Sequence, residues 1–135
     1  MRHRVYGKHL SRTKNQRTAL FKSLVQALIL SEKIETTQAK AKAIKGLVDR
    51  IITQSKSINT QRLVTQFIIS NEARKKLFDD ITPRLKDRNS GYTSIVKLGK
   101  RQGDGTEMVQ MSFLLEDAKV KSTKKESAPK VEKEA

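Results

Sequence analysis

The stretch that decides the fold is Tyr92-Thr93-Ser94-Ile95-Val96-Lys97-Leu98-Gly99-Lys100-Arg101-Gln102-Gly103-Asp104-Gly105-Thr106-Glu107-Met108-Val109-Gln110-Met111-Ser112-Phe113-Leu114-Leu115. Its centre, Gly103-Asp104-Gly105, is the strongest turn signal in the chain, and it predicts a β-hairpin because it separates two extended patterns. The first strand is expected over Tyr92 to Leu98 and the second over about Thr106 to Leu115. Alternate residues of the second strand form one apolar face, which predicts a sheet with one side on a core: Val109, Met111, Phe113 and Leu115.

Upstream of the hairpin, apolar residues at helical spacing predict four helices. The first is expected to follow a cap at Ser11 or Thr13 and to run to about residue 31, and the second to follow Thr36 or Thr37 and to run to about residue 55. The third is expected over residues 60–70. The fourth follows a cap at Asn71 and is weakened near its end by Pro83. Between the first two, residues 33–37 are rich in β-branched side chains, and periodicity leaves open an extended stretch or a brief strand.

The charge of the chain is strongly one-sided. Its 135 residues include 29 Lys and Arg against 14 Asp and Glu, for a net charge of +15 and a pI near 10.3. An excess of this size indicates an anionic partner. The chain has no cysteine and no tryptophan, no apolar run long enough to span a bilayer and no secretory signal, so we expect a cytosolic protein without disulfides and without a membrane partner.

The length predicts one domain with a tail at each end. Residues 1–10 are expected to form a basic arm. They open a run of 31 residues that holds seven Lys or Arg and two His but no carboxylate, since the first one is Glu32. A solubility tail is the simpler interpretation of such a run, but this one leads directly into an amphipathic helix. Residues 11–116 are expected to be globular. Residues 117–135 are rich in Lys, Glu, Ser and Ala and are expected to be disordered.

Basic residues concentrate at four places: the arm, the first turns of the first helix, the start of the second helix and the hairpin. If these lie on one side of the fold, they form a continuous positive surface for phosphates. The expected phosphate contacts near the N-terminus are Arg2, Arg4, Lys8, Arg12, Lys14 and Arg17. An isolated cation such as Lys56 is better interpreted as a solvated side chain. Tyr6 and Tyr92 are equally compatible with stacking on bases and with structural roles.

Catalysis and metal binding have little support in the sequence. His3 and His9 are the only imidazoles, and no carboxylate precedes Glu32 to orient either of them. No cluster has metal-ligand spacing, and Gly103-x-Gly105 lacks the remainder of a phosphate-binding loop. We therefore expect no enzyme activity, no cofactor, no metal and no small-molecule substrate.

The class of nucleic acid is less sharply indicated. A DNA-binding module would present a recognition helix to base edges, but these helices keep their stripes for the core. A basic arm and a basic hairpin suit structured RNA better. A DNA-compacting module is the alternative, and an adaptor that binds only proteins is a third class, whose binding would be nearly independent of salt.

Three motifs, in order, resemble the bacterial large-subunit ribosomal protein seventeen family. They are Met1-Arg2-His3-Arg4-x-x-Gly7-x-x-Leu10-x-Arg12, Ile34-x-Thr36-Thr37-x-x-Lys40-Ala41-Lys42, and Gly91-Tyr92-Thr93-x-Ile95-x-Lys97-x-Gly99-x-Arg101-x-Gly103-Asp104. The resemblance covers about residues 1–116. It implies an α+β fold, a two-layer domain with the helices packed on a three-stranded mixed sheet, so that residues 33–37 become a true strand.

The resemblance also implies function. Such proteins are structural components of the large ribosomal subunit, near the exit of the nascent-peptide tunnel, where they bind large-subunit (23S) ribosomal RNA beside neighbouring ribosomal proteins. The positions that match the family and are expected to bind RNA are Arg2, His3, Arg4, Lys8, Arg12, Thr37, Lys40, Lys42, Tyr92, Lys97 and Arg101, and Lys100 adjoins them. Two departures stand out, because Ser94 replaces a usual Arg, and Val5-Tyr6 and His9 replace a more uniformly basic pattern.

Overall fold

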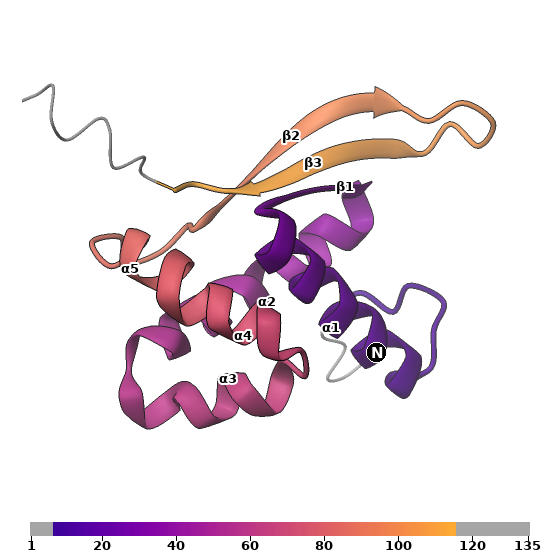
Figure 1. Cartoon of the computed structure of the whole chain (residues 1–135). Helices are drawn as coiled ribbons and strands as arrows, with labels where there is room; N and C mark the ends of the chain where they lie inside the picture. The colour runs from indigo at the N-terminus through magenta and orange to yellow at the C-terminus, as the bar shows by residue number, and fades with distance from the viewer. Residues whose placement is uncertain (1–6, 116–135) are drawn as a thin grey trace, which may run out of the picture.

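The computed structural model describes residues 7–115, which form two layers: a three-stranded sheet and a set of helices that cover one of its faces (Figure 1). The predicted helices packed on a three-stranded sheet are therefore confirmed. The predictions for residues 1–6 of the arm and for the tail from residue 116 onward lie outside the described residues.

Helix α1 spans Lys14–Ser31 and begins where its sequence directs it to begin. Of the two predicted caps, Thr13 is the N-cap: its hydroxyl accepts from the Gln16 amide at 3.4 Å, and the Gln16 side chain accepts from the Thr13 amide at 3.2 Å. This reciprocal capping box satisfies two amides that would otherwise lack partners. The helix ends as Glu32 turns the chain with a left-handed φ of 61°, which sends it directly into the sheet.

Strand β1 (Lys33–Thr37) confirms the strand that the resemblance implied. It pairs antiparallel with β3 (Glu107–Phe113), and β2 (Thr93–Lys100) pairs antiparallel with the other side of β3. The expected mixed sheet is wrong in this respect: the order is β1-β3-β2 and every pairing is antiparallel. The two strands that run in the same direction, β1 and β2, do not touch because the returning arm of the hairpin lies between them.

Helix α2 (Gln38–Lys56) runs beneath the sheet, and its start at Thr37 agrees with the sequence. A 3-10 turn (η1, Ile58–Thr60) and the short helix α3 (Gln61–Phe67) follow. The third helix is shorter than predicted because the chain becomes extended at Ile68, where the buried side chain continues the core without a further helical turn.

The last helical segment is α4 (Asn71–Lys76), a π-helical turn (η2, Leu77–Ile81) and α5 (Thr82–Arg84). Ser70, not the predicted Asn71, is the N-cap, because its hydroxyl accepts from the Ala73 amide at 3.4 Å. Pro83 cannot donate a backbone hydrogen bond, and the π turn lies directly before it. The Thr82 hydroxyl donates to the Leu77 carbonyl at 2.7 Å, and α5 ends one residue after Pro83, which agrees with the expectation that Pro83 weakens the helix near its end.

The core lies between the helices and the inner face of the sheet. The predicted inner face of β3 is confirmed, because Val109 and Met111 are fully buried and Phe113 is nearly so. Their partners come from the helices, including Leu28 of α1, Ile44 of α2, and the residues that cluster with them: Val25, Ile29, Val48, Ile51, Ile52, Val64, Ile68, Leu77, Ile81 and Leu85. This contiguous core holds the surface elements in fixed positions.

Candidate nucleic-acid interface

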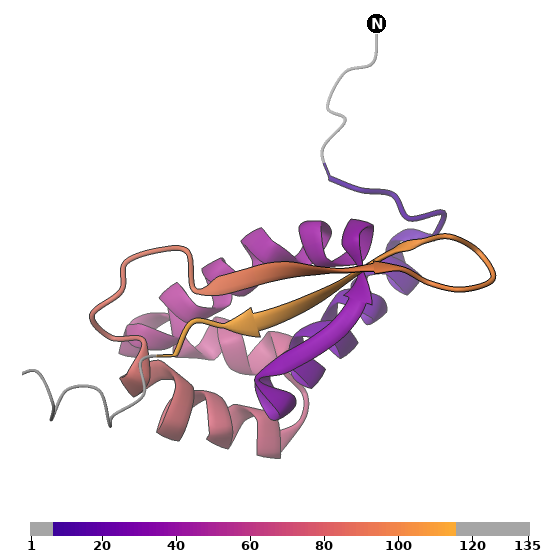
Figure 2. The same ribbon diagram turned by 90° about the horizontal axis from the view of Figure 1, so that it is seen from above.

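One end of the molecule gathers three of the four predicted basic segments. The turn of the β2–β3 hairpin projects past the body of the domain, and the described part of the arm and the first turn of α2 lie at the same end (Figures 1 and 2). These segments are far apart in the sequence. The fold therefore places a hairpin, an arm and a helix start where one extended partner can reach all of them.

The described part of the arm is fastened to α1 by arginine side chains. The Arg17 guanidinium donates to the carbonyls of His9 at 3.4 Å and Arg12 at 3.2 Å, and Arg12 donates to the Leu10 carbonyl at 3.0 Å. Leu10 and Ser11 have left-handed φ values of 53° and 50°, which residues other than glycine seldom adopt. Two of the predicted phosphate contacts, Arg12 and Arg17, thus shape the arm, while Lys14 is exposed on the first turn of α1.

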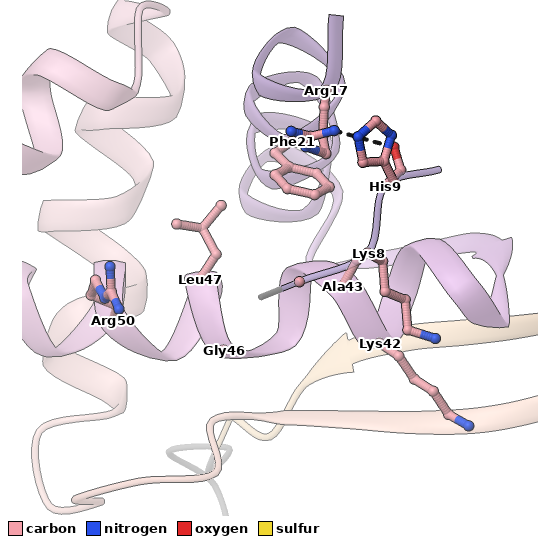
Figure 3. A pocket seen from close by; sticks show the side chains of 10 residues that line it. Lys8, His9, Arg17, Phe21, Lys42, Ala43, Gly46, Leu47 and Arg50 are labelled. Carbon is pink, nitrogen blue, oxygen red and sulfur yellow. Dashed lines mark hydrogen bonds between the residues drawn. The ribbon is translucent and has the colours of Figure 1, made fainter. Parts of the chain in front are cut away.

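A hollow of about 790 Å³ opens between the arm, α1 and α2 (Figure 3). Its wall on the arm is Gly7–His9, and Figure 3 shows Phe21 of α1 and Leu47 of α2 directed into the space between the two helices. The complete lining adds Arg17, Lys42, Ala43, Gly46 and Arg50. The lining contains no carboxylate, so the hollow is an apolar space bordered by cations.

Helix α2 contributes Lys42 and Arg50 to the lining of this hollow, while Lys40 lies outside it. Lys42 is exposed and Lys40 is half-buried, and the sequence predicted both as RNA contacts. Thr37 holds the N-cap position without a side-chain hydrogen bond to the helix. Arg50 was missed by the sequence analysis, although its spacing of eight residues from Lys42 puts it on the same face and was a usable signal.

The hairpin turn carries two exposed lysines and one arginine that is already paired. Lys97 and Lys100 are exposed along β2. The Arg101 guanidinium donates to both carboxylate oxygens of Asp104, at 3.1 and 2.6 Å, and the Thr106 amide and hydroxyl donate to the same carboxylate at 3.2 and 2.7 Å. These bonds hold the pKa of the Asp104 carboxyl well below its usual range, and the bond from Arg101 contributes most. Arg101 therefore orders the turn that presents the two lysines.

Tyr92 lies in the core, and its expected role in RNA binding is wrong for this conformation. The side chain is 1% exposed, so no base can stack on its ring. The hydroxyl donates to the Asn89 carbonyl at 2.9 Å and accepts from Lys56 Nζ at 3.1 Å. Lys56 also donates to the Arg88 carbonyl, and its ammonium lies 4.6 Å from the centre of the Tyr92 ring. Lys56 is thus a structural tie and not the solvated side chain that the sequence suggested.

Of the remaining predicted contacts, Arg2, His3 and Arg4 lie outside the described residues, as does Tyr6. Ser94 is half-buried in β2, opposite Ser112 on β3. Within residues 7–115, no helix is long and apolar enough to cross a membrane. The same part of the chain has no group of three or more His, Cys, Asp or Glu side chains placed to hold a metal ion.

Comparison with known proteins shows the family of this chain. A sequence model of the family described as Ribosomal protein L17 matches residues 20–114. The chain is 45% identical over 116 residues to the large ribosomal subunit protein bL17 of Thermodesulfovibrio yellowstonii, covering 84% of this chain and 87% of that protein. It is 47% identical over 116 residues to the protein of the same name from Aliarcobacter butzleri, covering 84% of this chain and all of that protein. This chain belongs to the ribosomal protein L17 family.

Proposed function

We propose that this protein is a structural constituent of the large ribosomal subunit, where it binds and stabilises large-subunit ribosomal RNA in support of translation. Family membership supports the assignment to the ribosome and to a non-catalytic role. The proposed RNA contacts are the basic segments at one end of the molecule.

The observation that carries the proposal is that three separate segments bring exposed cations to one end of the molecule. Where α1 meets α4, the carboxylate of Glu32 lies 2.9 Å from Lys76 Nζ, and Arg84 pairs with Asp80 at 3.4 Å. At the basic end, four exposed cations from the arm, the start of α2 and the hairpin have no ion-pair partner among residues 7–115: Lys8, Lys42, Lys97 and Lys100. Unneutralised charges of one sign on one part of a surface repel one another, and closely spaced phosphates remove that repulsion.

The proposed mechanism is electrostatic. The core fixes where the arm, the start of α2 and the hairpin lie, and their cations neutralise phosphates of neighbouring RNA segments. Contacts to about six to ten phosphates would make affinity fall steeply as salt is raised. The finer features that the resemblance implies, namely contact with 23S ribosomal RNA and neighbouring ribosomal proteins near the tunnel exit, remain part of this proposal.

Competition binding separates ribosomal RNA from duplex DNA as the partner. The full chain is titrated with a labelled large-subunit RNA transcript at physiological salt, with unlabelled duplex DNA of equal phosphate concentration as competitor. We expect DNA to displace little of the protein, because shape recognition of structured RNA adds to the phosphate contacts. Equal displacement by both nucleic acids would support the DNA-compacting alternative.

The contribution of the arm is tested with a variant in which Arg2, Arg4, Lys8 and Arg12 are replaced by Ala. We expect the thermal stability of the isolated protein to change little, because the core that residues 7–115 form is built from apolar side chains of the helices and the sheet. Incorporation into large subunits should fall sharply. A matched control replaces exposed cations away from the basic end, Arg62 and Lys75, by Ala. Normal incorporation of the arm variant would contradict the proposed role of the arm.

A further inference from the structure

The hollow between the arm, α1 and α2 has a composition that differs from a surface for phosphates alone. Most of its inner wall is apolar, while its cations stand at the border (Figure 3). We propose that it is a socket for one unstacked RNA nucleotide, with the base inside and the adjoining phosphates on the border. The inference rests on the proposed function, since it specifies how the same RNA is held.

The interior offers a base both contact area and a ring. Phe21 and Leu47 are partly buried against the core, and both also line the hollow. Bases that leave a helical stack are commonly held against aromatic side chains, and single-stranded segments are where proteins recognise RNA most specifically. A ring and a branched aliphatic side chain across from each other can therefore receive a flat base.

Gly46 leaves open space on the wall of the hollow. It lies within α2 on the wall of the hollow, and a Cβ atom built at this position meets nothing within 4 Å. Glycine inside a helix costs about 0.5–1 kcal/mol relative to alanine. A glycine that weakens its own helix is explained if the open space beside it is occupied by the RNA base.

The charges around the border suit a nucleotide. Lys8, Lys42 and Arg50 line the hollow from the arm and from α2, and no carboxylate lines it. Arg17 is held by the carbonyls of His9 and Arg12, so it fixes the wall formed by the arm. The volume of the hollow, about 790 Å³, lies within the range of about 300–1,000 Å³ that is typical of small-molecule sites. Cations at the border and an apolar interior together match a phosphate–base unit.

The test fills the hollow without changing its charge. The variant is Gly46→Leu, and the matched control is Ala27→Leu, which adds the same side chain at an exposed position of α1 outside the hollow. A second variant, Phe21→Leu, removes the ring but retains an apolar side chain. Each full chain is bound to a large-subunit RNA transcript, irradiated to form direct protein–RNA crosslinks and digested with trypsin, which releases Phe21 in the peptide Thr18–Lys22.

The wild-type chain and the Ala27→Leu control should crosslink through Thr18–Lys22. Gly46→Leu and Phe21→Leu should lose this crosslink and bind about tenfold more weakly. The dependence of affinity on salt should not change, because no charge has been removed. Circular dichroism and urea unfolding verify that each variant is folded.

Two failures are distinguishable. If the wild-type chain binds the transcript but Gly46→Leu and Phe21→Leu keep its affinity and its crosslink, the socket is refuted and the proposed function stands. If the wild-type chain does not bind the transcript, the proposed function fails and the socket fails with it.

Discussion

Replacement of Tyr92 by Phe separates a structural role from a role in binding. The change removes one oxygen atom and leaves the ring, so the apolar packing of a side chain that is 1% exposed is retained. What is lost is the hydroxyl that bridges Lys56 Nζ, at 3.1 Å, and the Asn89 carbonyl, at 2.9 Å. The loop that leads from the last helix into β2 then loses this bridge, while it keeps the bonds from Lys56 to the Arg88 carbonyl and from the Tyr92 amide to the Asp49 carboxylate of α2.

The magnitude follows from these two bonds and from a longer third contact, since Thr53 Oγ1 lies 3.4 Å from the Tyr92 hydroxyl oxygen. A neutral hydrogen bond contributes a net of about 0.5–1.5 kcal/mol, and one to a charged group about 1.5–3 kcal/mol. Lys56 is only half-buried and keeps its bond to the Arg88 carbonyl, which reduces the loss on that side. We expect Tyr92→Phe to lower the free energy of unfolding by about 2 kcal/mol, or Tm by about 8 °C for a domain of this size.

Urea unfolding followed by circular dichroism measures this change, and the matched control is Tyr6→Phe, the same substitution at the only other tyrosine. The midpoint should fall for Tyr92→Phe alone, with an unchanged slope. Affinity for ribosomal RNA at 25 °C should match that of the wild-type protein. A Tyr92→Phe variant of wild-type stability, or one with normal stability and weakened RNA binding, would refute the reasoning from burial.

Three further outcomes are expected. Gly46→Ala should raise the free energy of unfolding by about 0.5–1 kcal/mol in urea unfolding, because the added methyl group meets open space beside α2. A free energy of unfolding below that of the wild-type protein would contradict the open space at Gly46. Replacing Lys97 and Lys100 by Ala should leave stability unchanged and reduce the slope of log affinity on log salt by about 1.5–2, and an unchanged slope would remove the hairpin from the interface. The pKa of Asp104 is lowered in the folded state, so its contribution to the turn should be fully present above about pH 4 and be lost on acidification below that value. Hydrogen exchange of the Thr106 amide, corrected for intrinsic rates, should become faster as the pH falls, and equal exchange in Asp104→Asn and the wild-type protein would contradict this role of Asp104.

The layers of the fold are predictable because each depends on local patterns. The hairpin follows from the glycines around Asp104 and from the alternation in β3, and the helices follow from apolar spacing. Residues 33–37 needed the family resemblance, since a five-residue strand has too few side chains to establish a period. The antiparallel order was not predictable from local patterns, because it depends on which strand the returning chain places in the centre.

The candidate binding residues divide in the same way. Exposed cations such as Lys42 and Lys100 were identified by charge alone, and the structure leaves both at the surface. Tyr92 and Lys56 both have structural roles that were not expected, because a tertiary contact between α2 and the start of β2 decides them, and no local pattern contains that contact. Arg50 was missed because it is isolated in the sequence and joins the basic residues only along the face of a helix.

Sucrose-gradient sedimentation of the tagged full chain from a cell lysate, before and after a moderate-salt wash, tests the central claim most directly. If the protein is a structural part of the large subunit that is held by many phosphate contacts and a fixed core, it should cosediment with the large-subunit peak and stay there through the wash. Protein at the top of the gradient, or protein released with DNA after nuclease treatment, would contradict the account.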